Sequence, residues 1–304
     1  MEFLTDPWSW WVEPFTGNAF MLRALTAGLL TVVATSVVGT WLVLRGMTYL
    51  GDALAHGVLP GIAMAYVFGG STTLGALLAA LVMVGGIHVV RQHSPLPDDV
   101  SIGLLFVAML ALTVVIVSRS ARLDGTDLEG FLFGSVMSIE AVDLWRQAVS
   151  VAVTLVGAAL FHRSFLVLTL DETQAALLGL RPRLAHLALL VLVAVSIVAA
   201  FEVVGSMLVF AFLVAPPAAA AMLVRRVPAM MATSALIGTG SVLLGALLAH
   251  NLLGTAGHLH GESPVGAGHA SPEEVAMPAT MALVAVAVVL VVMVARGVRS
   301  DQEA

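Results

Sequence analysis

Two side chains that can bind a metal ion stand four residues apart in an otherwise apolar stretch. The stretch is MTYLGDALAHGVLPG, residues 47–61, and the two side chains are Asp52 and His56. On an α-helix, residues at this spacing lie one above the other on the same face. A carboxylate oxygen and an imidazole nitrogen are ligands of divalent transition metals. The pair therefore indicates a metal site; an Asp–His hydrogen bond that only joins two helices is the structural alternative.

The same stretch has the length and composition of a membrane span. An aspartate inside a span is costly unless it pairs, binds an ion or faces water. Pro60 and Gly61 follow the pair, and a proline there is expected to interrupt the helix and free backbone carbonyls. Interrupted helices form substrate sites in many transporters. Two ligands do not complete a site, so freed carbonyls, water or the same pair from a second subunit could supply the rest.

Composition sets the protein class. Of the 304 residues, 60% are hydrophobic and only 11% are charged, which is far below the level of soluble domains. The chain has no cysteine, so any metal site must use nitrogen and oxygen donors. It also has no lysine, which a Walker A phosphate loop requires. If ATP drives this protein, the ATPase is therefore another chain. We expect a multi-pass membrane protein with lipid around it and no nucleic-acid partner.

The apolar segments predict an all-α fold, a polytopic helical bundle of about 8–9 transmembrane helices. We expect a Trp-rich interfacial segment at 1–18, a single transmembrane domain at 19–299 and a tail at 300–304. A short apolar segment, 131–139, is expected to be re-entrant or interfacial. The predicted spans are 19–44, 47–68, 72–90, 100–117, 144–161, 184–200, 203–224, 228–250 and 275–295.

The arginines predict the orientation, because basic residues collect on the cytoplasmic side. The outer group is expected to be Arg23, Arg119, Arg122 and Arg146. The cytoplasmic group is expected to be Arg45, Arg91, Arg163, Arg181, Arg183, Arg225, Arg226, Arg296 and Arg299. This orientation places the C-terminus inside, and the N-terminus and the loop at 251–274 outside.

Further candidates for metal binding lie on the predicted outer side. The loop at 251–274 is rich in Gly, His and Pro, and such tracts often collect metal weakly. Glu202, near the outer end of a span, is either a pathway or proton-relay carboxylate or a residue at the interface in water. The accessory candidates are His250, His258, His260, His269 and Glu202.

A polar connection at 162–183 contains a candidate docking element. The segment DETQAALLGL, 171–180, is typical of a short helix, with Asp171 and Glu172 at its N-terminus and Gly179 at its end. Such a helix on the cytoplasmic face can transmit movement from a soluble partner; an ordinary connector is the alternative.

Four stretches in order resemble the permease subunits of the zinc/manganese ABC importers, the ABC-3 family. They are LRGMTYLGDALAHGVLPGIA at 44–63, DLEGFLFGSV at 127–136, LDETQAALLGL at 170–180 and VVGSMLVFAFLVAPPAAA at 203–220. The GDxLxH pattern in the first is the most specific part. The resemblance extends from about residue 19 to 250.

The resemblance implies a homodimer in the bacterial cytoplasmic membrane, with the fold of metal/cobalamin-type importers. It implies two partners, a cytoplasmic ATPase and an extracytoplasmic metal-binding protein. It assigns Asp52 and His56 to the metal pathway and 171–180 to the helix that contacts the ATPase. The residues expected to couple to the ATPase are Asp171, Glu172, Ala175, Leu178 and Gly179. The loop at 251–274 is longer than is usual in the family, and we expect it to receive or buffer metal.

These observations predict a permease subunit that moves a divalent metal by alternating access, breaks no covalent bond and has no resident cofactor. Zn²⁺ is favoured over Mn²⁺, because the outer histidines are better donors to Zn²⁺. One alternative is a proton-coupled secondary transporter with Glu202 and His56 as the relay. Another is an ABC permease for a metal chelate. An intramembrane metalloenzyme has no support, because HExxH is absent.

Overall fold

The computed structural model describes residues 19–94, 97–119, 140–170, 175, 177, 179–254 and 272–303. Within these residues, the regular elements are all helices. They are α4 (Ala19–Leu44), α5 (Tyr49–Gly57), α6 (Leu59–Phe68), α7 (Thr72–His93), α8 (Asp98–Arg119), α10 (Ala141–Leu170), α12 (Pro182–Val204), α13 (Ser206–Leu223), α14 (Val227–Leu248), a π-helical turn η2 (Ala249–Gly254) and α16 (Pro272–Glu303).

The helices are those of a polytopic membrane protein. In the described part of the chain, seven are long and apolar enough to cross a membrane, or eight if the bent helix α10 is one span. Helix α13 is a shorter apolar helix, and at 1.5 Å per residue its 18 residues approach the thickness of the bilayer core. The predicted all-α membrane bundle is therefore confirmed.

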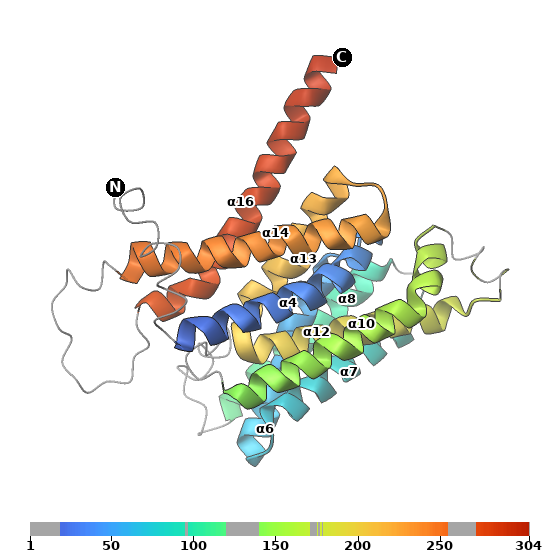
Figure 1. The fold of residues 1–304 in the computed structure, drawn as a ribbon. Helices are drawn as coiled ribbons and strands as arrows, with labels where there is room; N and C mark the ends of the chain where they lie inside the picture. Colours follow the sequence, from blue (N-terminus) through green and yellow to red (C-terminus); the bar gives the residue numbers. More distant parts are fainter. Residues whose placement is uncertain are drawn as a thin grey trace, which may run out of the picture.

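Helix α4 lies at the centre of the bundle, where it contacts α10, α12, α13 and α14 (Figure 1). The small and hydroxyl-bearing residues of α4 allow this close packing. The hydroxyl groups of several threonines donate hydrogen bonds to the backbone carbonyl four residues earlier in the same helix. Trp41 near its end is fully buried and meets His162 and Phe165 of α10 edge-on. Helix α16 packs on α13 and α14, and its C-terminal part projects beyond the other helices (Figure 1).

Helix α10 differs from the prediction. The sequence predicted a span at 144–161 and then a polar connection, but the helix continues to Leu170. It bends by 63° between Leu160 and His162. The continuation remains helical because it carries apolar side chains that find a core: Phe165 and Leu168 are buried.

For the predicted helix at 171–180, the structure describes the C-terminal end. Ala175 and Leu177 are helical, and Gly179 adopts a φ of +74°. The backbone N–H of Leu180 donates to the carbonyl of Ala175 over 3.0 Å. These are the features of a Schellman motif, which confirms Gly179 as the residue that ends this helix.

One end of the bundle collects residues that the arginine pattern had placed together in the cytoplasm. Arg45, after α4, contacts His186 in the first turn of α12. The far end of α4 instead meets the start of α10, where Gln147 donates to the Ala27 carbonyl and to Thr31. The contact between α4 and α12 therefore agrees with the prediction that Arg45, Arg181 and Arg183 share one side.

Several predictions fall outside the described residues. These are the interfacial segment at 1–18, the apolar segment at 131–139 and the tail residue 304. The three loop histidines His258, His260 and His269 are also outside, as are the coupling residues Asp171, Glu172 and Leu178.

Candidate metal site

A tight turn positions the helix that carries the predicted metal ligands. Helix α4 ends in a second Schellman motif, in which Gly46 has a φ of +70° and the Met47 N–H donates to the Leu42 carbonyl over 3.0 Å. The Leu50 N–H then donates to the Met47 carbonyl over 3.1 Å, which begins α5. Asp52 therefore lies in the first turn of α5, close to the end of the bundle that holds Arg45.

Asp52 and His56 lie side by side on α5, as their spacing predicted. The Nε2 atom of His56 is 3.6 Å from Oδ1 of Asp52. Two ligands of one tetrahedral ion, each about 2.1 Å from it, are roughly 3.4 Å apart. The observed separation therefore suits two ligands of one ion. It is longer than a good hydrogen bond between these two groups.

The pair is open on one side. The side chain of Asp52 is 45% exposed and that of His56 is 31% exposed. A carboxylate in a membrane span is stable only when water, an ion or another protein group solvates it. The exposed side of the pair must therefore face an aqueous path or a second protein surface, because lipid would not solvate it.

Neighbouring helices cover the rest of α5. Gly51 packs so closely on α13 that a β-carbon there would lie 2.4 Å from a methyl group of Leu213. Phe106 of α8 meets the His56 ring edge-on, with ring centroids 6.0 Å apart, and so helps to orient the imidazole. Helix α5 thus has one side packed tightly against its neighbouring helices and one open side, and the ligand pair lies between them.

The helix is interrupted after His56, as predicted from Pro60. Helix α5 ends at Gly57, Val58 forms the junction, and α6 begins with Pro60 in its first turn. The backbone N–H of Val58 donates to the carbonyls of Leu54 and His56. Both carbonyls are therefore hydrogen-bonded, whereas the sequence analysis expected Pro60 to free backbone carbonyls here.

A small cavity beside Asp52 brings in a residue that the sequence analysis did not select. The cavity has a volume of about 190 Å³, and its polar lining includes Asp99 and Tyr49. Its lining residues are Tyr49, Asp52, Ala53, Asp99, Ile102, Gly103 and Phe106. The signal that could have identified Asp99 is an acidic residue at the start of a span, just after the loop that follows α7.

Of the other predicted ligands, the structure places His250 away from the pair. Close contacts of Gly28 with Val242 and of Gly238 with Val32 show that α14 runs antiparallel to α4. His250, which follows α14, is therefore at the end opposite to Arg45. Glu202 is in the last turn of α12, and its side chain is outside the described part of the structure. Among the described residues, no three His, Asp or Glu side chains gather closely enough to hold an ion.

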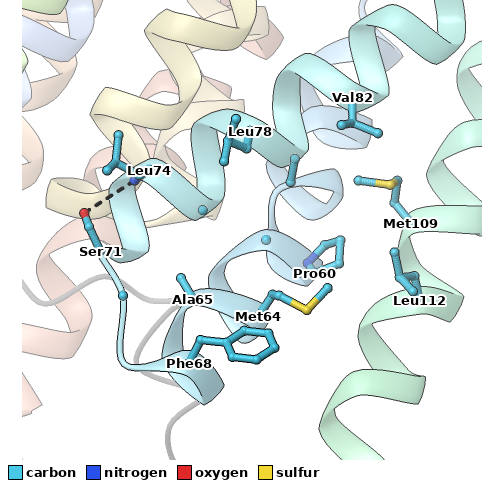
Figure 2. A pocket seen from close by; sticks show the side chains of 14 residues that line it. Pro60, Met64, Ala65, Phe68, Ser71, Leu74, Leu78, Val82, Met109 and Leu112 are labelled. Atoms are coloured by element: carbon cyan, nitrogen blue, oxygen red, sulfur yellow. Dashed lines mark hydrogen bonds between the residues drawn. The ribbon is translucent and has the colours of Figure 1, made fainter.

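A larger hollow lies between α6, α7 and α8, with a volume of about 440 Å³. Figure 2 shows Pro60, Met64 and Phe68 of α6 on one side and Met109 and Leu112 of α8 on another. The lining carries no carboxylate or imidazole. It offers no suitable ligand for a hard cation, so we do not assign it to metal transport.

Two glycines hold α6 against α7 at the edge of this hollow. A β-carbon at Gly61 would lie 2.1 Å from the Gly75 carbonyl oxygen, and one at Gly75 would lie 2.3 Å from that of Gly61. Only glycine permits this approach of two backbones. The crossing fixes α6 directly after the interruption that follows the ligand pair.

Comparison with known protein families identifies the fold and the class. Residues 18–259 match the ABC 3 transport family. The chain belongs to this family. The match contains the Asp52/His56 stretch and all helices from α4 to η2, so the predicted family is confirmed. The predicted class, a transport subunit of the bacterial cytoplasmic membrane rather than an enzyme, is confirmed with it.

Named relatives of this ABC 3 protein transport different metals. The manganese transport system membrane protein MntC of Halalkalibacterium halodurans is 36% identical over 227 residues, covering 75% of this chain and 77% of the relative. The chelated iron transport system membrane protein YfeD of Yersinia pestis is 32% identical over 247 residues, covering 81% and 82%.

A solved structure shows the same fold. The structure titled PsaBC from Streptococcus pneumoniae in complex with Fab aligns with a TM-score of 0.75. The alignment covers 93% of this chain and 94% of the other at 24% identity. At this identity, the similarity supports the fold alone.

Proposed function

We propose that this chain is the permease subunit of an ABC importer and that it moves a divalent metal ion, with Mn²⁺ as the first candidate, past Asp52 and His56. The observation that carries the proposal is the half-exposed Asp52/His56 pair at a distance suited to one ion, inside a span of an ABC 3 protein. In this function the two side chains replace part of the hydration shell of the ion. Alternating access then exposes the pair to one side of the membrane and then to the other.

Manganese is preferred over zinc because of the relatives and the donor set. The MntC relative is named for manganese, and it is similar over three quarters of this chain. A carboxylate suits Mn²⁺ well, and one imidazole suits either metal. The prediction of Zn²⁺ depended on the outer histidine loop, most of which lies outside the described residues.

A chelated metal is the second candidate, since the YfeD relative is named for chelated iron. The cavity beside Asp52 argues for a bare ion. Its volume is about 190 Å³, whereas pockets for organic ligands usually have about 300–1,000 Å³. A chelate would need a wider site than the one beside this pair.

We propose that the pair works in a homodimer. One chain supplies two ligands, and a transition metal takes four to six. A second copy of the chain that faces the first across the open side of α5 would add the same two ligands. It would also cover the exposed carboxylate, which lipid cannot solvate.

The proposed partners are a cytoplasmic ATPase and an extracytoplasmic metal-binding protein. The segment 171–180 is the proposed contact with the ATPase. Its Leu177 is 83% exposed, whereas Ala175, two residues earlier, is buried against the bundle. An apolar side chain that projects from a polar connection on the predicted cytoplasmic side is a typical anchor for a partner protein.

Metal uptake into proteoliposomes tests the proposed function. The chain is reconstituted together with its ATPase and binding protein, and uptake of Mn²⁺, Zn²⁺ and Fe²⁺ is measured at equal free concentrations. We expect uptake that requires ATP and is fastest for Mn²⁺. Uptake that continues without ATP but follows a proton gradient would instead support the secondary transporter.

A further inference from the structure

His186 is a buried polar side chain to which the proposed transport path gives no role. It lies in the first turn of α12 and is 1% exposed. Its Nδ1 atom is 2.8 Å from an Nη atom of Arg45, which is 141 residues earlier in the chain. No local pattern in the sequence indicates this contact, because the two residues are so far apart in the chain.

The chemistry of the two groups determines the direction of this hydrogen bond. A guanidinium group can only donate, so Nδ1 of His186 accepts and its proton is on Nε2. Among the described residues, no hydrogen-bond partner faces this Nε2 atom. A buried N–H without a partner is rare and requires an explanation. One explanation is that this side chain has a second arrangement in which Nε2 is satisfied.

The two residues connect the segments on which transport depends. Helix α12 begins at Pro182, immediately after the segment proposed to contact the ATPase, and its helical bonding starts with the Ala185 N–H donating to the Arg181 carbonyl over 3.0 Å. Arg45 is in the turn between α4 and α5, the helix of the metal ligands. Because this turn is closed by the bond from Met47 to Leu42, a shift of Arg45 is passed on to α5.

The start of α12 has space in which to move. An open hollow of about 560 Å³ lies between residues 179–184 and the residues His88 and Gln92 at the end of α7. A packed interface would resist displacement of this segment, because protein interiors leave little free volume. This hollow is therefore an observation independent of the hydrogen bond, and it concerns the same short segment.

We propose that the Arg45–His186 hydrogen bond is a positioning link that couples the ATPase-contact segment to the metal-site helix α5. Movement of residues 179–184 displaces the start of α12, which carries His186. Through its hydrogen bond, His186 then moves Arg45. Because Arg45 lies in the turn between α4 and α5, this shift reorients Asp52 and His56. The link touches neither ATP nor the metal. It rests on the proposed function, because it needs both a partner ATPase and a transported ion.

The test separates transport from ATP hydrolysis in proteoliposomes that contain all partner chains. His186→Leu removes the acceptor but keeps a side chain of suitable size, and His186→Asn restores an acceptor close to the position of Nδ1. For His186→Leu we expect Mn²⁺ uptake per ATP hydrolysed to fall at least about fivefold, since the hydrogen bond that joins α12 to the turn at Arg45 is lost. ATP hydrolysis should remain within about twofold of the wild type, and His186→Asn should recover most of the uptake per ATP.

His162→Leu is the matched control, because His162 also packs at this end of α4 through its ring contact with Trp41. Its uptake per ATP should remain that of the wild type. An unchanged ratio in His186→Leu overturns the proposal, as does an equal loss in His186→Asn. A wild-type chain that takes up no metal would instead refute the proposed function.

A second measurement covers the case in which His186→Leu does not assemble. The chain has no cysteine, so the double substitution Gln92→Cys and Arg183→Cys introduces one pair of thiols across the hollow and leaves Arg45 and His186 in place. Because the proposal moves residues 179–184 relative to α7, a short bifunctional thiol reagent should cross-link this pair with different yields in the nucleotide-free and the ATP-bound complex. Equal yields in both states would contradict this movement.

Discussion

At the scale of single residues, the proposed function depends on the Asp52 carboxylate. It is 45% exposed, and it lies in a helix that is otherwise apolar. A carboxylate in a membrane span destabilises the protein unless it pairs, binds an ion or faces water. His56, at 3.6 Å, gives this carboxylate a second ligand for the proposed coordination site. Because no third ligand lies near the pair among the described residues, we propose that a second copy of the chain supplies the remaining ligands.

Asp99 gives a prediction at the same scale. It shares the cavity beside Asp52 without joining it in a three-ligand group. We expect Asp99→Asn to lower the initial rate of Mn²⁺ uptake by about twofold to tenfold, because a nearby carboxylate attracts the ion without coordinating it throughout transport.

The control for this prediction is Asp98→Asn, which removes the neighbouring charge, and uptake in both variants is measured at limiting Mn²⁺. An Asp99→Asn rate equal to that of the wild type would exclude Asp99 from the path. A complete loss would make it an essential ligand, which also contradicts the prediction.

The sequence predicted these residues only where local spacing was sufficient. Asp52 and His56 are four residues apart, so the periodicity of a helix brings them together. Asp99 and the Arg45–His186 bond depend on how distant helices meet, and no local pattern contains that information. The zinc preference relied on the histidines of the loop at 251–274, most of which lies outside the described residues.

At the scale of elements, the interrupted span formed by α5 and α6 is the part that carries the site. Pro60 ends the regular bonding of α5, and the close crossing of Gly61 and Gly75 then fixes α6 against α7. These contacts make the position of the ligand pair depend on backbone packing rather than on flexible side chains.

Gly61→Ala tests this packing. The added methyl group would lie 2.1 Å from the Gly75 carbonyl oxygen, so the two helices must separate. We expect destabilisation of about 1–3 kcal/mol, as for other overpacked sites. The measurement is the thermal midpoint of the purified chain in detergent, followed by its monodisperse fraction in size-exclusion chromatography.

Gly85→Ala is the matched control for Gly61→Ala, because a β-carbon at Gly85 meets nothing within 4 Å. Its thermal midpoint should not change. Equal midpoints for Gly61→Ala and the wild type would show that the crossing is looser than the structure indicates.

Membrane helices could be predicted from the sequence wherever polar residues mark both ends of an apolar segment. The spans at 19–44 and 72–90 agree with α4 and α7 to within a few residues. Helix α10 was predicted too short, because His162 and Arg163 interrupt its apolar pattern although the helix continues beyond them. The burial of Phe165 and Leu168 that sustains this continuation is a tertiary contact and is not visible in sequence.

At the scale of the whole molecule, the bundle has two chemically different ends. The end with Arg45, His186 and residues 179–184 is the predicted cytoplasmic end, and the ligand pair is near it. This arrangement places the proposed ion site and the proposed ATPase contact on the same side of the protein. A short mechanical connection between them is therefore sufficient.

The proposed dimer is the prediction at this scale. We expect the chain to purify with its ATPase as a complex that contains two copies of each, because a second copy would complete the ligand set and cover the open side of α5. Native mass spectrometry of the complex in lipid nanodiscs measures this stoichiometry. Asp143→Asn, at the other end of the bundle, should leave it unchanged. A complex with a single copy of this chain would contradict the proposal that two ligand pairs form one site.

The measurement that tests the central claim most directly is Mn²⁺ uptake by Asp52→Asn in the reconstituted complex. The substitution keeps the shape of the side chain and removes its charge, and Asp143→Asn removes a carboxylate far from the site. The account predicts that Asp52→Asn loses at least about tenfold of the ATP-dependent uptake at equal membrane abundance, while Asp143→Asn retains it. Full uptake by Asp52→Asn would contradict the account, because the Asp52/His56 pair would then be a structural contact and not the path of the metal.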